Sequence, residues 1–153
     1  MNNAKTMTIA DVMTKSVISV DVSMTINGAA KMMEDAKVGA VIVMENNTPV
    51  GIVTDRDFAI KVVAHAYNIT TPVKQIMSSP LFSINSVESV RTAADLMHDR
   101  GIRKLPVTDN EKIIGIITAT DIVNLLAVCV EDDVRDMYFH SVVKIYANYS
   151  PYN

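Results

Sequence analysis

The chain lacks the features that mark secreted, disordered and membrane-spanning proteins. Its 153 residues include one cysteine, Cys129, and no tryptophan, with five glycines and five prolines. A single cysteine cannot form an internal disulfide, and the longest apolar runs are far shorter than the roughly 18 residues of a membrane span. Because 49% of the residues are hydrophobic, the chain has enough apolar material for a core. We therefore expect a soluble cytoplasmic protein that is not associated with a membrane.

A strong charge of one sign is also missing. Fourteen lysines and arginines are set against 17 aspartates and glutamates, for a formal net charge of -3. Proteins that bind duplex nucleic acid usually carry a basic surface, and those that bind single strands use aromatic side chains as stacking platforms. With five tyrosines and three phenylalanines, this composition argues against nucleic acid as a partner. Any anionic ligand has to be held by a local group of side chains.

What the chain does have is an internal repeat with a period of 64 residues. The segment Gly51–Asp57, GIVTDRD, recurs as GIITATD at Gly115–Asp121. The same offset, without a gap, also aligns Met13 with Met77. A register kept over such a distance indicates two copies of one structural unit.

Each copy contains the same order of predicted elements. Hydrophobic runs predict three strands, and apolar residues at helical spacing predict a helix after the first strand. A second helix is expected to begin at the threonine that follows the third strand. The predicted strands are residues 17–20, 40–44 and 50–53 in the first copy, and 81–84, 105–108 and 113–117 in the second. This pattern predicts an α/β (α+β) fold with one three-stranded sheet per copy, whose second and third strands form a hairpin. Two such units packed back to back would each cover one face of the other's sheet.

The repeat divides the chain into four parts. We assign residues 8–66 to the first domain, 67–74 to a linker, 75–126 to the second domain and 127–153 to a C-terminal helical extension. Apolar residues between 134 and 146 recur at helical spacing. We expect this added helix to pack on the module or to pair with a second chain.

The end of the third strand in each copy carries the residues best suited to binding. Thr54 follows the strand and Asp57 lies one turn into the next helix, as do Thr118 and Asp121 in the second copy. The first amides of a helix lack internal partners, and a carboxylate beside them suits a vicinal diol such as a ribose. Thr-x-x-Asp also resembles a capping box, in which these side chains bond only to their own helix. Both interpretations remain open.

The two copies of Gly-apolar-x-Thr-x-x-Asp, with DVMT at 11–14 and GIRKLPV at 101–107, resemble a tandem pair of CBS domains, often called a Bateman module. The resemblance covers roughly residues 8–126. It implies two β-α-β-β-α domains packed about a pseudo-twofold axis. It also implies reversible binding of AMP, ADP, ATP or S-adenosylmethionine in clefts between the domains. Such modules are regulatory and not catalytic, and they usually form homodimers whose state a protein partner reads. We expect no cofactor.

The resemblance also implies which residues line the two clefts. In similar modules the aspartate holds the ribose and the threonine lies near the ribose or phosphate, while the base lies against the starts of two strands. One cleft would combine Thr118 and Asp121 with Ser16, Val17, Ile18, Val38, Gly39 and Ala40. The other would combine Thr54 and Asp57 with Pro80, Leu81, Phe82, Ile102, Arg103 and Lys104.

Basic residues are distributed unequally between the copies. Arg103 and Lys104 align with Gly39 and Ala40, and Arg56 aligns with Thr120. Guanidinium groups suit phosphate oxygens, so we predict two unequal sites, with Arg103 as a phosphate contact. The alternative is that these side chains are solvated charges.

A second function remains open beside the ligand sensor. The chain could be a structural or interaction module whose clefts are empty and which dimerises through its helices. Its distinguishing sign would be that both Thr–Asp pairs serve wholly as helix caps. An enzyme is not expected, because the sequence offers no paired nucleophile and base and no metal-ligand spacing.

Overall fold

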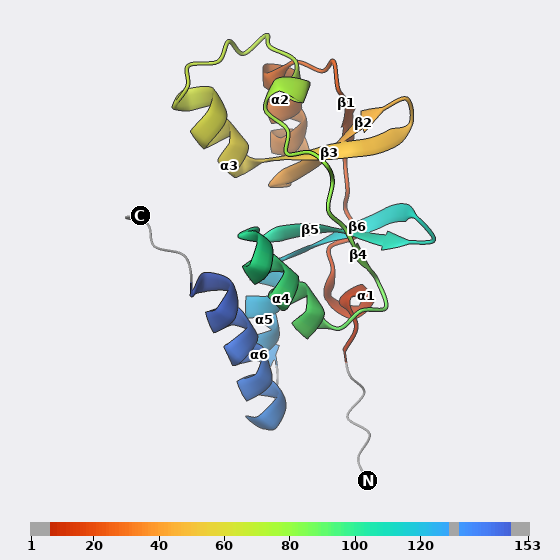
Figure 1. The fold of residues 1–153 in the computed structure, drawn as a ribbon, viewed down its shortest axis with the longest axis vertical. Helices are drawn as coiled ribbons and strands as arrows, with labels where there is room; N and C mark the ends of the chain where they lie inside the picture. Colours follow the sequence, from red (N-terminus) through yellow and green to blue (C-terminus); the bar gives the residue numbers. More distant parts are fainter. Residues whose placement is uncertain (1–6, 129–131, 148–153) are drawn as a thin grey trace. The chain divides into compact units, whose positions relative to one another are not determined.

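A computed structural model describes residues 7–128 and 132–147 (Figure 1). Cys129 lies outside the described residues. The chain divides into two compact units. We call residues 16–82 the N-terminal unit, and residues 7–15 together with 83–147 the C-terminal unit. None of the helices in the described part of the chain has the length and apolar character to cross a bilayer.

The N-terminal unit is a three-stranded sheet with helical segments attached. Its elements are β1 (Ser19–Asp21), α2 (Ile26–Ala36), β2 (Ala40–Glu45), β3 (Thr48–Thr54), α3 (Asp55–Asp57), the π-helix η1 (Phe58–Val63) and the 3-10 helix η2 (Val73–Gln75). The strand order is β1-β2-β3, with β1 parallel and β3 antiparallel to β2. The sequence predicted a single helix from Thr54, whereas the structure divides this segment into α3 and η1. Phe58 and Val62 of η1 both pack on the unit's core.

The C-terminal unit repeats this plan and adds one helix. Its elements are α1 (Ile9–Val12), β4 (Ile84–Asn85), α4 (Val90–Arg100), β5 (Lys104–Asp109), β6 (Lys112–Thr118), α5 (Ala119–Val128) and α6 (Asp132–Tyr146). The strand order is β4-β5-β6, again with one parallel and one antiparallel pair. The predicted mixed α/β (α+β) class, with two three-stranded sheets and an added C-terminal helix, is therefore confirmed.

The first helix of each repeat forms where its cap and its apolar spacing predict it. The side chains of Thr25 and Ser89 accept hydrogen bonds of 3.0 Å from the amides of Gly28 and Thr92, which satisfies amides that have no partner within the helix. α4 ends at Gly101, which has a φ of 62°, a conformation that glycine adopts without strain. Three buried positions are shared by the two helices: Ile26, Ala29 and Met33 in α2 match Val90, Ala93 and Met97 in α4, which also buries Ala94.

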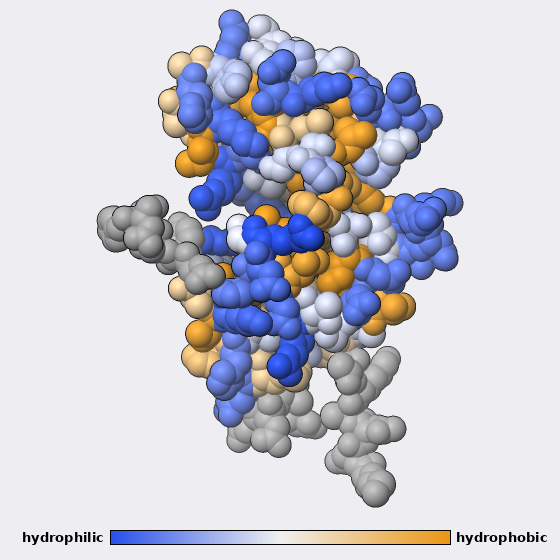
Figure 2. All heavy atoms as spheres, in the orientation of Figure 1, coloured by the Kyte–Doolittle hydropathy of each residue, from blue (hydrophilic) through white to orange (hydrophobic). Residues whose placement is uncertain are grey.

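The two hairpins close with the same kind of turn. Asn46 and Asn47 join β2 to β3, and Asn110 and Glu111 join β5 to β6, all four with positive φ. Two central residues in this conformation match the twist of the adjoining strands. Both tips are hydrophilic, as Figure 2 shows on the face that it displays.

The segment that precedes each repeat packs on the sheet of the other repeat: the segment at Ser78 on β3, and the segment at Thr14 on β6. Ser78 pairs with Ile52 of β3, while Thr14, its equivalent in the repeat, pairs with Ile116 of β6. Both pairs exchange two backbone hydrogen bonds, of 2.8 and 3.1 Å at Ser78 and of 2.9 Å each at Thr14. Part of the predicted linker, residues 67–74, also packs within the N-terminal unit, because Pro72 pairs with Thr25.

This exchange explains why each motif begins with a glycine. A Cβ added at Gly51 would lie 2.8 Å from the carbonyl oxygen of Ser78, and one at Gly115 would lie 2.8 Å from that of Thr14. The sulfur atoms of Met77 and Met13 would be as close, at 2.8 and 2.6 Å. The absence of a side chain at the two glycines thus allows the exchanged segment to approach the strand.

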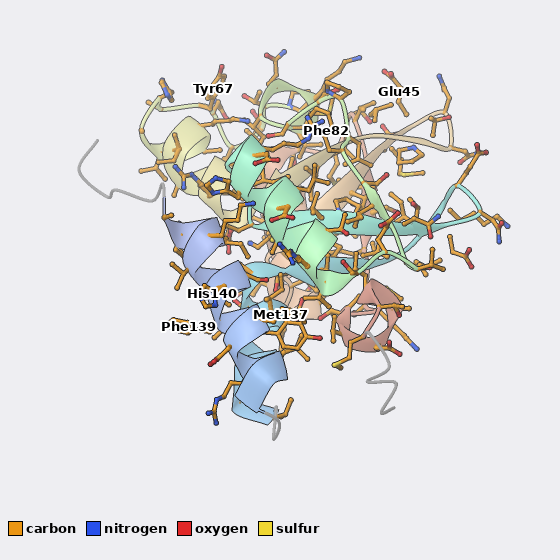
Figure 3. All side chains as sticks on the ribbon, turned by 60° about the horizontal axis from the view of Figure 1, so that its bottom comes forward. Glu45, Tyr67, Phe82, Met137, Phe139 and His140 are labelled. Atoms are coloured by element: carbon orange, nitrogen blue, oxygen red, sulfur yellow. The ribbon has the colours of Figure 1, made fainter. Side chains whose placement is uncertain are left out.

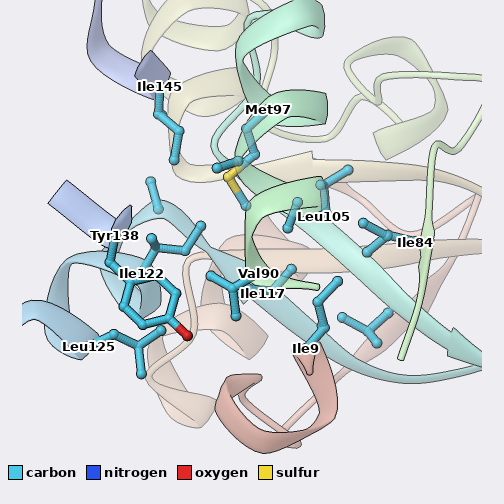
Figure 4. Packing of buried hydrophobic residues seen from close by; sticks show 14 residues of the cluster. Ile9, Ile84, Val90, Met97, Leu105, Ile117, Ile122, Leu125, Tyr138 and Ile145 are labelled. Carbon is cyan, nitrogen blue, oxygen red and sulfur yellow. The ribbon is translucent and has the colours of Figure 1, made fainter. Parts of the chain in front are cut away.

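The added helix α6 packs on α4 and α5 of the C-terminal unit. Tyr138 and Ile145 of α6 are buried in the same cluster as Leu125 of α5 (Figure 4). Lys144 fixes the end of the helix, because its carbonyl oxygen lies 2.7 Å from Nδ1 of His98 and its amine 2.7 Å from Asp95. Of the two predicted uses of this helix, packing on the module is the one that the structure shows. Met137 and Phe139 of α6 remain exposed (Figure 3).

Candidate functional site

In the N-terminal unit, Thr54 and Asp57 form a closed arrangement at the start of α3. The backbone N–H of Thr54 donates to Oδ2 of Asp57 at 2.8 Å, and its hydroxyl donates to the same oxygen at 3.0 Å. Thr54 has extended backbone dihedral angles and ends β3, so the strand leads directly into the helix. These are the contacts of a capping box.

Thr118 and Asp121 form the same arrangement at the start of α5. The backbone N–H and the hydroxyl of Thr118 donate to Oδ2 of Asp121 at 2.7 and 2.8 Å. The amide of Asp121 donates in return to the threonine hydroxyl, at 3.1 Å. Both motifs thus form the capping contacts that the sequence allowed, and these contacts use one carboxylate oxygen of each aspartate.

The two aspartates differ at the other oxygen. Oδ1 of Asp57 lies 2.8 Å from the amine of Lys61, and that amine also donates to the carbonyl oxygen of Ile76 at 2.6 Å. The repeat places Leu125 where Lys61 stands, and Leu125 is buried in the apolar core. Within residues 7–128 and 132–147, Oδ1 of Asp121 forms no ion pair or hydrogen bond with another residue. The two aspartates thus share the contacts of Oδ2 and differ in those of Oδ1.

Each unit brings the start of its second strand to its own helix start. The amide of Asp55 donates to the carbonyl oxygen of Gly39 at 3.1 Å, and that of Ala119 to the carbonyl oxygen of Arg103 at 2.9 Å. The predicted residues Val38, Gly39 and Ala40 thus lie beside Thr54 and Asp57, and Ile102, Arg103 and Lys104 lie beside Thr118 and Asp121.

The residues predicted to contact the base before each first strand have different surroundings. Ser16, Val17 and Ile18 lead into β1, and the carbonyl oxygen of Ile18 accepts a hydrogen bond of 3.0 Å from Ile42 of β2. Pro80, Leu81 and Phe82 precede β4, and Phe82 is exposed (Figure 3). That these residues complete a site with the other copy's Thr–Asp pair stays a prediction.

The basic residues also have distinct environments. The guanidinium carbon of Arg103 lies 4.7 Å from the centre of the Tyr146 ring, a cation–π contact that ties Arg103 to α6. Arg103 and Lys104 are half-buried, whereas Arg56 is exposed. Arg103 is therefore held by packing instead of being a freely solvated charge.

Sequence reasoning did not identify two of these residues. Lys61 could have been found, because its place four residues after Asp57 is the spacing of a helical ion pair and its counterpart in the repeat is apolar. Tyr146 lies beyond the repeat, so no aligned position pointed to it. Among the residues described, no group of three or more histidine, cysteine, aspartate or glutamate side chains could hold a metal ion.

Comparison with known proteins gives a consistent result along most of the chain. The family model for the CBS domain matches residues 9–64 and 73–128. CBS domain-containing protein YhcV of Bacillus subtilis is 37% identical over 114 residues, which cover 74% of this chain and 81% of that protein. Protein MK0525 of Methanopyrus kandleri is 39% identical over 112 residues, which cover 70% of this chain and 57% of that protein.

Solved structures show the same architecture. A CBS-domain protein of Burkholderia ambifaria, 28% identical, aligns with a TM-score of 0.75 over 82% of this chain and 97% of its own. The CBS domain pair of protein MJ0100, 26% identical, aligns with a TM-score of 0.71 over 78% of this chain and 98% of its own. That structure is a complex with 5′-methylthioadenosine and S-adenosyl-L-methionine.

Proposed function

This chain belongs to the CBS-domain family, and we propose that it is a regulatory, non-catalytic module that reversibly binds an adenosine-containing ligand. The ligand is a nucleotide such as AMP, ADP or ATP, or S-adenosylmethionine. The observation that carries this proposal is the carboxylate of Asp121, which is fixed at the start of α5 by Thr118 and has one oxygen left unbonded by the described residues.

The chemistry of this position suits the sugar of such a ligand. The 2′- and 3′-hydroxyls of a ribose are adjacent donors, and Oδ1 of Asp121 is an acceptor with more than one lone pair. The bonds from Thr118 fix the orientation of the carboxylate before a ligand arrives, which lowers the entropic cost of binding. The complex of protein MJ0100 supports the ligand class, because both of its ligands contain an adenosine group.

Arg103 is the residue that we assign to a phosphate group of the ligand. A guanidinium is always charged and can donate two parallel hydrogen bonds to phosphate oxygens. The stacking of Arg103 on Tyr146 pre-orients this fork. Gly39 stands at the equivalent position of the first copy, so the two copies differ in their capacity to hold an anion.

Occupancy is transmitted to a protein partner through α6. Arg103 contacts α6 through Tyr146, so a phosphate that shifts the guanidinium together with the stacked ring changes the packing of that helix. A ligand shifts the protein only to the extent that it binds one arrangement better than the other. We also propose a homodimer, for which the exposed Phe139 and Val143 of α6 offer an apolar surface.

A structural or interaction module with empty sites is the second candidate. The capping contacts that both Thr–Asp pairs make favour it. It requires that these side chains act wholly as helix caps, and the unbonded oxygen of Asp121 argues against that requirement.

Isothermal titration of the purified protein with adenosine, AMP, ADP, ATP and S-adenosylmethionine tests the proposal. We expect saturable binding of at least one of these compounds, and a co-purifying adenosine ligand in the native mass spectrum. If folded protein binds none of them, the sensor function is wrong and the interaction module stands. Size-exclusion chromatography with light scattering tests the homodimer separately.

A further inference from the structure

We propose that Lys61 is a specificity-determining residue that closes the carboxylate of Asp57, so that the module binds one adenosine ligand tightly, at Asp121. This inference rests on the proposed function, since it concerns which of the two repeated motifs can hold a sugar. The two motifs are identical at threonine and aspartate. What differs is the side chain one turn later.

Both oxygens of the Asp57 carboxylate are engaged inside the N-terminal unit. Oδ2 accepts the two hydrogen bonds from Thr54, and Oδ1 lies 2.8 Å from the amine of Lys61. The side chain of Asp57 is 11% exposed and that of Lys61 is 35% exposed, so the pair is screened by water less than a fully exposed one. A ribose at Asp57 must therefore compete with an ammonium group for the same oxygen.

Two further features hold Lys61 in this position. Its amine also donates to the carbonyl oxygen of Ile76, which directly follows η2 and lies two residues before Ser78. In addition, an acidic residue four positions before a basic one is the favourable order for a helical ion pair. The lysine is thus anchored at two points, and moving it away breaks both contacts.

The C-terminal unit has no such group at the equivalent place. Leu125, which stands there, is 6% exposed and belongs to the apolar core around Ile122 and Tyr138. An apolar side chain can neither neutralise nor bond to a carboxylate. Oδ1 of Asp121 therefore has no cationic partner among the described residues and is left for the donors of a sugar.

The experiment is a titration with adenosine, which carries no phosphate and therefore leaves the role of Arg103 aside. We compare the wild type with K61M, D121N and the double variant K61M/D121N. Methionine keeps the length of the lysine side chain but lacks its charge. The matched control is K74M, which removes another ion pair of the same unit, that of Lys74 with Glu45, at the opposite end of the β2–β3 hairpin from Thr54.

We expect one tight site per chain in the wild type and in K74M. D121N should lower the affinity by at least about tenfold, the factor that 1.4 kcal/mol represents. K61M should raise the stoichiometry to two, and K61M/D121N should recover one site. Circular dichroism and thermal unfolding verify that each variant is folded. If D121N does not fold, the stoichiometry of K61M decides alone.

The outcomes separate this inference from the proposed function. Absence of adenosine binding to any folded variant would contradict the sensor function itself. Two equal sites in the wild type, tight binding retained in D121N, or a stoichiometry of one in K61M would overturn the role of Lys61. Each of those three results would leave the sensor function intact.

Discussion

The two units carry the same motif on the same fold, yet they differ in what surrounds it. In the N-terminal unit, Asp57 is paired with Lys61 and is followed by a π-helix. In the C-terminal unit, Asp121 opens a regular α-helix, and the neighbouring Arg103 is stacked on a helix that the other unit lacks. The comparison teaches that an intact sequence motif does not establish an equivalent site, because the surroundings decide whether its side chains are available.

The difference extends to the packing of each unit. The helices of the C-terminal unit are covered by α6, which contributes Tyr138 and Ile145 to the core. The N-terminal unit instead leaves Ile60 and Val63 of η1 exposed, at 50% and 77%. Within the described residues, the duplicated fold of the C-terminal unit is therefore completed by a segment from outside the repeat.

The largest effect is expected from removing the anchor of α6. Tyr138→Ala deletes an aromatic side chain that is 2% exposed, and such substitutions cost about 3–5 kcal/mol. We expect the C-terminal unit to unfold at a much lower denaturant concentration and α6 to become sensitive to proteolysis. Denaturation by urea and limited proteolysis measure this, with Phe139→Ala, on the exposed side of α6, as the control. Equal losses for the two variants would contradict the packing of α6.

Substitutions at Gly51 and Gly115 test whether the segments at Ser78 and Thr14 pack equally tightly on their two sheets. Ala at Gly51 or at Gly115 places a Cβ 2.8 Å from a backbone carbonyl oxygen in both cases. Overpacking of this kind costs about 1–3 kcal/mol, and we expect similar values for the two variants. Chemical denaturation gives both numbers. A cost at only one of the glycines would show that the exchange is less tight in the other unit.

Most of the fold could be predicted from the sequence because the signals are local. The apolar spacing from Ile26 to Met33, the caps at Thr25 and Ser89 and the asparagines of the first hairpin act within a few residues. The exchange of the segments at Thr14 and Ser78 could not be predicted. The repeat aligns these residues with each other, but it does not say which sheet each one joins.

The sequence singles out the two Thr–Asp motifs, whose role as a site stays a prediction, but it does not predict the contacts that these residues make. Asp57 and Lys61 are four residues apart, as are Lys31 and Asp35 in α2, yet within the described parts of the chain only the first of these two pairs forms an ion pair. The order of the charges is reversed in the second pair, which is the less favourable arrangement. The contact of Tyr146 with Arg103 joins residues 43 positions apart, and no local pattern announces it.

A substitution of Arg103 tests whether the two copies differ in their capacity to bind the phosphate of a ligand. Arg103→Met should weaken AMP binding by about tenfold, since a charge-assisted hydrogen bond contributes about 1.5–3 kcal/mol when fully formed. The affinity for adenosine should change far less, because adenosine has no phosphate. Calorimetry with both compounds gives the ratio, and Arg103→Lys should retain part of the AMP affinity. An equal loss for both compounds would exclude the phosphate role.

The smallest effect is expected at Tyr146, which acts on the ligand only through Arg103. Tyr146→Leu removes the ring 4.7 Å from the guanidinium, and a cation–π contact of this kind contributes about 0.5–1 kcal/mol. We therefore expect the affinity for AMP to fall by about threefold. Tyr146→Phe keeps the ring and should bind AMP with the affinity of the wild type. Phe139→Leu is the control, since this aromatic residue lies on the exposed side of the same helix. In an Arg103→Met background, Tyr146→Leu should have no further effect on AMP binding. A further loss there would mean that Tyr146 contributes to the site independently of Arg103.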